Sequence, residues 1–204
     1  MLSLIASALN RKDEAPNIEL AERLAKSKNT VGISEIVCGL SMSNAIAGDC
    51  IKVLYEIGER EPKLLVPHVE VFVELLRSKN NRLVWGSMAA LDEITTLCPE
   101  EIFDRFDAIY AAYKVGSVIT IDHSISVFAK LCSADKKYEK KVLPILVEHF
   151  EKCRTKEIPQ HLERASVCIT SDNSAKFVTV IGDRYDEMTD PQKTRVTKVL
   201  RQKR

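Results

Sequence analysis

An apolar pattern that returns every 37 residues constrains the fold more than any other feature of this sequence. Residues 82–97 form an apolar and polar pattern with helical periodicity, and similar stretches lie before and after it. Three residues occupy equivalent positions at this interval (Leu54, Leu91, Phe128), as do three more (Ile57, Ile94, Leu131). A fixed interval of this length predicts stacked helix pairs in which both sets are buried. An all-helical bundle with equal helix lengths would give similar spacing and remains an alternative.

Turn and capping residues divide the rest of the chain into further helices. Asn29-Thr30, Asp135, Asn173 and Thr189 precede apolar stretches as N-caps do, and no segment predicts a strand. Val118–Ile121 is rich in β-branched residues, but the repeat places it on a helix. The expected helices cover 1–10, 17–28, 31–41, 48–59, 63–77, 82–97, 100–113, 119–132, 138–152, 157–170, 174–185 and 190–204.

Composition excludes several classes of protein. Of 204 residues, 45% are hydrophobic and 29% charged, which is typical of a globular chain. The net charge of +1 creates no global attraction to nucleic acid or to a membrane. No apolar run reaches the length of a membrane span. Residues 1–12 are apolar first and basic afterwards, the reverse of a secretory signal, which predicts a packed first helix.

The cysteines favour a reducing environment. They form no C-x-x-C pair, and most lie on apolar helical faces. We therefore expect reduced thiols in a cytoplasmic protein, with no metal bound to them. The six positions are Cys38, Cys50, Cys98, Cys132, Cys153 and Cys168.

A helix pair every 37 residues resembles the HEAT-repeat family of armadillo-type α-solenoids. Pro67 and Pro144 match the family's proline in the first helix of a pair, whereas residues 100–113 have Pro99 instead. The family's Asp-Val-Arg turn is absent, and Asn81-Arg82-Leu83 is the nearest approach to it. The second-helix pattern is matched by Leu83, Ser87, Met88, Ala90, Leu91 and Ile94.

The resemblance implies an all-α fold, a right-handed α-solenoid of about five antiparallel helix pairs. We expect one domain over 1–204, with capping helices at 1–29 and 171–204 around a repeat core at 30–170. Solenoids bind partners on the concave surface of successive second helices.

Outward positions of the second helices predict a ligand-binding face of mixed, mildly acidic charge. Tyr55 and Trp85 suit an anchor for a protein or peptide segment, although Trp85 at the edge of the core is an equal alternative. The wheel places Tyr55, Trp85, Asp92 and Glu93 outside the buried arc. The full candidate set is Lys52, Tyr55, Glu56, Trp85, Asp92, Glu93, Asp122 and Lys130.

Other functions have less support. DNA-binding or alkylated-base-excising relatives need a basic concave face. The only basic side chains in the candidate set are Lys52 and Lys130, so we expect no nucleic acid partner. The histidines are scattered in the sequence, and Asp122 and His123 diverge by about 100° on a helix. No phosphate loop or nucleophile elbow occurs. We expect a non-enzymatic scaffold without cofactor or metal.

Basic residues gather late in the chain, at 136–141 and 193–204. These segments either dock an acidic partner or form solvated helix faces and a cationic helix end. The sequence leaves both readings open.

Overall fold

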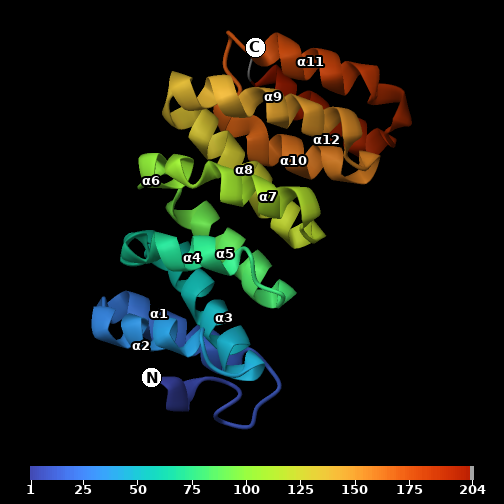
Figure 1. Cartoon of the computed structure of the whole chain (residues 1–204). Coiled ribbons are helices and arrows are strands. Elements are labelled where there is room, and N and C mark those ends of the chain that lie inside the picture. Colours follow the sequence, from blue (N-terminus) through green and yellow to red (C-terminus); the bar gives the residue numbers. More distant parts are fainter. Residues whose placement is uncertain (203–204) are drawn as a thin grey trace. The chain divides into compact units, whose positions relative to one another are not determined.

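The computed structural model describes residues 1–202, and this range contains helices and connecting turns but no β-strand (Figure 1). The α-helices are α1 (Ala15–Ser27), α2 (Thr30–Gly39), α3 (Asn44–Arg60), α4 (Val69–Leu75), α5 (Asn81–Ile94), α6 (Pro99–Asp104), α7 (Phe106–Val115), α8 (Val118–Ala134), α9 (Lys136–Lys152), α10 (Ile158–Ala165), α11 (Ser174–Asp183) and α12 (Asp190–Arg201). Short 3-10 turns lie at Leu2–Leu4, Pro62–Leu64, Val66–His68, Thr155–Glu157, Ser166–Cys168 and Tyr185–Glu187.

The repeat positions form the core. Leu54, Leu91 and Phe128 are completely buried, on α3, α5 and α8. Ile57, Ile94 and Leu131 are also completely buried. The prediction from the 37-residue interval is confirmed, and the fold is an all-α solenoid.

The chain forms two compact units, Met1–Ser124 and Ile125–Arg204, and their boundary falls within α8. In the first unit, α3 packs against α1, α2 and α5, and α4 packs against α5. In the second unit, α11 packs against α9 and α12, and α10 packs against α12. α3 therefore lies at the centre of the first unit.

A glycine permits the close contact between α3 and α5. A Cβ atom added at Gly86 would lie 2.6 Å from Cγ1 of Ile51, which is completely buried. Ala89 and Ala90 extend this small-residue surface along α5 and are also buried. Small side chains thus let the two helices approach closely.

Three N-cap predictions are confirmed and one is wrong in detail. The Asn29 side chain accepts a hydrogen bond from the Gly32 amide (2.8 Å), and Asp135 accepts one from the Lys137 amide (2.6 Å). Thr189 forms a reciprocal capping box with Gln192. Asn173 does not cap α11 through its side chain, which instead accepts a hydrogen bond from the Thr170 amide.

The expected helix at 1–10 is wrong beyond its first 3-10 turn. The amides of Ala6 and Ser7 donate to the side chains of Asn17 (2.9 Å) and Asp49 (2.7 Å), rather than to helical carbonyls. Asn17 also donates to Asp49 (2.8 Å), and both of these side chains are buried. Polar side chains on α1 and α3 therefore bind this segment in a non-helical form.

Three other expected helices are shorter or interrupted. Pro62 and Pro67 lie in 3-10 turns, so the expected helix at 63–77 is α-helical only over α4. The expected helix at 100–113 divides into α6 and α7 at Arg105, whose φ of −102° and ψ of 11° leave the helical region. The stretch 157–170 is α-helical only over α10.

Candidate functional site

Two aromatic side chains from adjacent helices meet in the first unit. Tyr55 on α3 and Trp85 on α5 have ring centroids 5.5 Å apart with a tilt of 50° between their planes. Both residues are half-buried. Tilted aromatic pairs at this distance are favourable beyond the area that they bury. Trp85 thus combines both readings of the sequence, because it packs at the core edge and keeps part of its surface exposed.

A buried lysine supports this aromatic pair. The ammonium of Lys52 lies 4.8 Å from the centroid of the Tyr55 ring, 2.7 Å from the Glu56 carboxylate and 3.1 Å from the Glu14 carboxylate. Burial opposes the charged form, but hydrogen bonds to Glu56, Tyr55 and Glu14 outweigh it and raise the pKa of Lys52. Lys52 remains charged and fixed beneath the ring.

Glu56 connects Lys52 to Arg60 along the same face of α3. Its carboxylate lies 2.6 Å from the Arg60 guanidinium, which also donates to the Glu56 carbonyl (2.7 Å). Burial opposes ionisation of Glu56, but hydrogen bonds to Lys52 and Arg60 prevail and lower its pKa. Each oxygen of the Glu56 carboxylate is therefore paired with a basic side chain of the protein.

The expected outward placement of Lys52, Glu56 and Asp92 is wrong, because these residues are only 8%, 8% and 4% exposed. α3 packs against α1 on one side and α5 on the other, so positions outside its apolar arc are also covered. A helical wheel identifies one apolar face of a helix, but it does not show whether neighbouring helices also cover the other faces. These three residues lie beneath the exposed surface.

Asp92 pairs with a histidine that the candidate set omits. Its carboxylate lies 2.8 Å from Nδ1 of His123, which is half-buried at the start of α8. The contact joins α5 to α8 within the first unit. The two residues are 31 positions apart, so only the tertiary packing of the repeat reveals the pair.

The remaining candidates keep some exposure. Glu93 is half-buried, and a Cβ atom at Gly58 would lie 3.2 Å from its Cβ, so its stem packs on α3. Asp122 is half-buried on α8, next to His123. Lys130 is also half-buried but belongs to the second unit.

Glu14, at the start of α1, is a further member of the network that sequence reasoning missed. It contacts Lys52 and also accepts a hydrogen bond from Arg82 (2.9 Å), which lies 68 positions away. No local spacing could have indicated this contact. It connects the beginning of the chain to α3 and α5.

A cluster of possible metal ligands lies in the second unit. His149, Cys153 and His161 offer ligand atoms that all lie within 4.8 Å of one another. The histidines are scattered in the sequence, and no metal was expected from their positions. The available signal was the four-residue interval between His149 and Cys153, which places both on one helix face.

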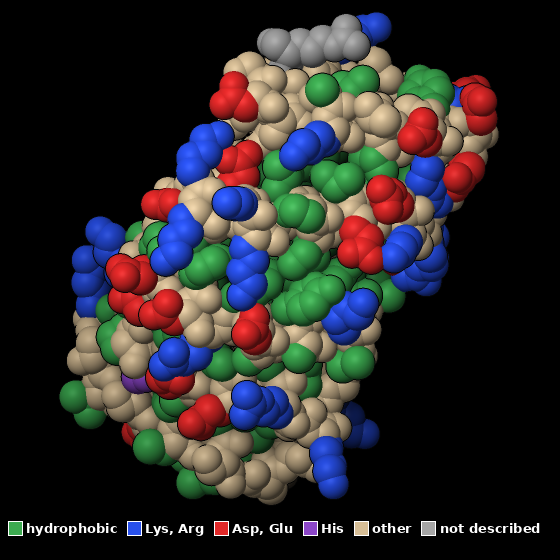
Figure 2. Space-filling view, turned by 45° about the horizontal axis from the view of Figure 1, so that its top comes forward, with side chains coloured by type: hydrophobic (Ala, Val, Ile, Leu, Met, Phe, Trp, Pro, Cys, Tyr) green, Lys and Arg blue, Asp and Glu red, His purple; other side chains and the backbone are tan. Residues whose placement is uncertain are grey.

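Charges elsewhere are mixed. Figure 2 shows acidic and basic side chains interspersed on the face in view, with hydrophobic side chains between them. In the late basic segments, Lys136 lies 2.9 Å from Glu139, and Arg195 binds Glu163 through two hydrogen bonds of 2.9 and 2.6 Å. Lys203 and Arg204 lie outside the described residues.

Burial suppresses the acidity of several thiols. The four buried cysteines are Cys50, Cys98, Cys132 and Cys168. Burial raises the pKa of Cys50 to about 12 and that of Cys98 to about 11. Their placement on apolar faces agrees with the sequence analysis. In the part of the chain that the structure describes, no helix has the length and apolar character of a membrane span.

Comparison with known proteins identifies the fold as similar to armadillo repeat proteins. A designed armadillo repeat protein in complex with the peptide (KR)4 has 11% identity and a TM-score of 0.69, over 96% of this chain and 91% of that one. Computationally designed armadillo repeat proteins for modular peptide recognition give 11% identity and a TM-score of 0.68, over 97% and 94%. An engineered protein gives 14% identity and a TM-score of 0.68, over 98% and 96%.

Sequence comparison gives no such likeness. No family model matches the chain, and no curated protein matches it. The likeness is therefore one of architecture. It agrees with the solenoid that the 37-residue interval predicts.

Proposed function

We propose that this chain is a non-enzymatic binding module that holds an extended basic segment of a partner protein. The proposed site, here called the aromatic–acidic face, consists of Tyr55, Trp85, Glu93 and Asp122. The observation that carries the proposal is the half-buried Tyr55–Trp85 pair, whose rings contact each other across α3 and α5. Large aromatic side chains with restricted motion are the usual anchors of protein interfaces.

The carboxylates give the site its selectivity. Glu93 follows Asp92 on α5, and Asp122 lies on α8 beside the histidine that pairs with Asp92. Carboxylates on a binding face favour lysine and arginine side chains and disfavour acidic ones. The designed armadillo protein of similar fold is in complex with the basic peptide (KR)4, which supports a basic ligand by analogy.

The buried polar residues keep this face in place. The ion pairs of Lys52 with Glu14 and Glu56 fix the helix that carries Tyr55. The Asp92–His123 contact fixes α5 against α8. Their role is to preorganise the site, which lowers the entropic cost of binding. We also infer a cytoplasmic location, because four buried thiols suit a reducing compartment.

The experiment uses Trp85, the only tryptophan of the chain, as a reporter. Its emission is followed while the full chain is titrated with (KR)4 and, separately, with an alternating Glu–Asp peptide of equal length. The basic peptide should change the emission saturably, and the acidic peptide should not. Added salt should weaken the binding, because the carboxylates contribute through charge.

The matched control is Tyr185→Phe, in the second unit, which should bind like the parent protein. Tyr55→Ala should weaken binding. Absence of any saturable change with (KR)4 would contradict the proposal. Tighter binding of a DNA duplex than of the peptide would favour the DNA-binding alternative instead.

A further inference from the structure

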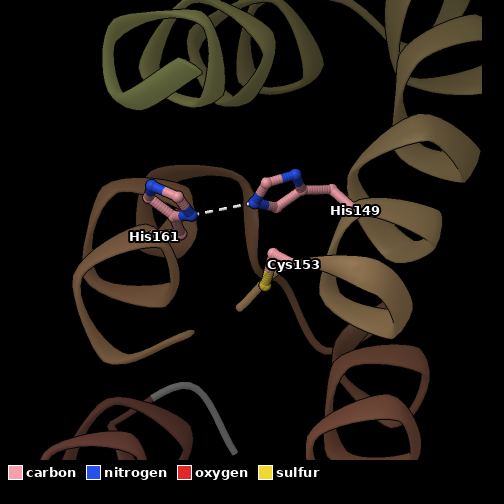
Figure 3. A group of neighbouring side chains, drawn as sticks. All are labelled: His149, Cys153 and His161. Carbon is pink, nitrogen blue, oxygen red and sulfur yellow. Dashed lines mark hydrogen bonds between the residues drawn. The ribbon is translucent and has the colours of Figure 1, made fainter. Parts of the chain in front are cut away.

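We propose that His149, Cys153 and His161 form a binding site for Zn²⁺ in the second unit. Figure 3 shows His149 and His161 directed toward each other from α9 and α10, with Cys153 beside them at the end of α9. Nε2 of His149 lies 2.8 Å from Nδ1 of His161. The ligand atoms of the three residues all lie within 4.8 Å of one another.

Local structure explains why the three side chains converge. His149 and Cys153 are four residues apart, so they share one face of the last turn of α9. The Cys153 amide donates to the His149 carbonyl (2.8 Å), which closes that turn. The chain then reverses through Thr155–Glu157 into α10, which presents His161 to the same space.

The donors suit zinc. Imidazole nitrogen and cysteine sulfur are its usual ligands, at about 2.0–2.1 Å for nitrogen and about 2.3 Å for sulfur. Tetrahedral binding at these lengths separates two nitrogens by about 3.4 Å and nitrogen from sulfur by about 3.6 Å. The histidine nitrogens must therefore separate by about 0.6 Å, and the sulfur must move inward by at most about 1.2 Å.

Burial limits the access of solvent to the site. His161 is completely buried and His149 is 6% exposed, whereas Cys153 is half-buried and gives access from outside. Without metal, one imidazole donates to the other across the 2.8 Å contact. The ion would replace this hydrogen bond, and three protein ligands would leave a fourth position for water or another donor.

Neighbouring groups hold the site in position. Arg184 donates to the carbonyls of Phe150 (3.0 Å) and Cys153 (2.6 Å), which fixes the end of α9. Its guanidinium also lies 4.0 Å from the Cys153 sulfur and forms an ion pair with Glu187 at 2.6 Å. Groups that hydrogen-bond to the ligating residues orient those residues for a metal. Zinc bound here would contradict the expectation from the sequence that no cysteine binds metal.

The test uses the full chain, freed of metal with a chelator and titrated with Zn²⁺ against a chromophoric competitor. The parent protein should bind one equivalent. Co²⁺ should give a thiolate-to-cobalt charge-transfer band in the near ultraviolet. Cys153→Ser should abolish this band and weaken zinc binding by at least about tenfold. Loss of a group that only hydrogen-bonds to a metal ligand already lowers metal affinity by about that much.

Cys38→Ser is the matched control, since Cys38 is an exposed cysteine on α2, and it should bind like the parent. His161→Gln should weaken zinc binding if it folds. Cys153→Ser, at a half-buried position, decides the outcome if it does not. The proposal fails if the parent binds no zinc at micromolar concentration. It also fails if Cys153→Ser keeps the charge-transfer band.

Discussion

At the residue scale, partial burial determines what each candidate side chain can contribute. Tyr55 and Trp85 each have part of the side chain packed against the protein and part accessible to solvent. A ligand can therefore contact them without a change in the fold. Lys52 and Glu56 are buried and paired with each other. They contribute stability and position rather than direct contact.

Trp85→Ala should weaken binding of the (KR)4 peptide by about 2 kcal/mol, a usual cost for an interface anchor. It should also reduce the free energy of unfolding by about 1 kcal/mol, because the Tyr55 ring loses its aromatic partner. Peptide titration, followed by anisotropy of a labelled peptide, and chemical denaturation of the same variant measure both. A variant that keeps normal affinity would remove Trp85 from the site.

Glu56→Gln should reduce the free energy of unfolding by about 1–3 kcal/mol at neutral pH, because it leaves Lys52 and Arg60 without their shared carboxylate. The pKa of Glu56 is lowered in the folded protein, so its contribution is present above its ordinary pKa of 4.5 and is lost as the pH falls through the folded value. The pKa of Lys52 is raised, so the contribution of the pair also fades above 10.5.

The difference between parent and Glu56→Gln should therefore be constant near neutrality and shrink at both extremes of pH. Denaturation at a series of pH values measures it. A difference that grows below pH 4.5 would show that Glu56 is not stabilised as the carboxylate.

At the element scale, the contact between α3 and α5 supports the candidate face. Their close approach depends on Gly86, which lies against the buried Ile51. α5 is also joined to α8 through Asp92 and His123. A disturbance of α5 should thus affect stability and ligand binding together.

Gly86→Ala should lower the free energy of unfolding by about 1–3 kcal/mol, because the new methyl group would overlap Ile51. Gly182→Ala is the matched control on α11, where nothing lies within 4 Å of an added Cβ. It should raise stability by about 0.5–1 kcal/mol, since alanine favours a helix more than glycine does. Equal effects of the two substitutions would contradict the close packing of α3 and α5.

Leu91→Ala should cost about 2–5 kcal/mol, the range for truncation of a completely buried leucine. Leu97→Ala, at a 41% exposed position just after α5, should change stability by about 0.5 kcal/mol or less. Thermal or chemical unfolding of the two variants gives the comparison. Similar losses in both would remove Leu91 from its role as a repeat anchor.

The sequence predicts helices where one pattern decides the structure, and it fails where distant residues compete. The periodicity of α5 and the caps at Asn29 and Thr189 are local signals, and the structure confirms them. Residues 1–10 are diverted by Asn17 and Asp49, which no local pattern indicates. The interruption at Arg105 likewise has no strong sequence signal.

For the candidate site, the repeat interval brought Tyr55 and Trp85 into consideration, and the structure places them in contact. The interval does not predict that α1 packs against α3. Lys52 and Glu56 were therefore expected at the surface, but both are buried. Glu14 lies 38 positions from Lys52 in the sequence, and His123 lies 31 positions from Asp92. Such contacts depend on tertiary packing alone.

At the scale of the whole molecule, the repeat accounts for the fold, while local charge accounts for the proposed selectivity. The net charge of +1 gives no general attraction for a basic ligand. The proposal therefore attributes any preference for (KR)4 to the carboxylates of the aromatic–acidic face, Glu93 and Asp122. The ratio of affinities for basic and acidic peptides isolates this effect, because the aromatic contribution is common to both.

The most direct measurement is this ratio in the parent protein and in the double variant Glu93→Lys/Asp122→Lys. Dissociation constants are measured for (KR)4 and for the alternating Glu–Asp peptide, with circular dichroism to verify the fold. The parent should prefer the basic peptide, and the double variant should prefer the acidic one. An unchanged ratio in a folded double variant would contradict the assignment of ligand selectivity to this face.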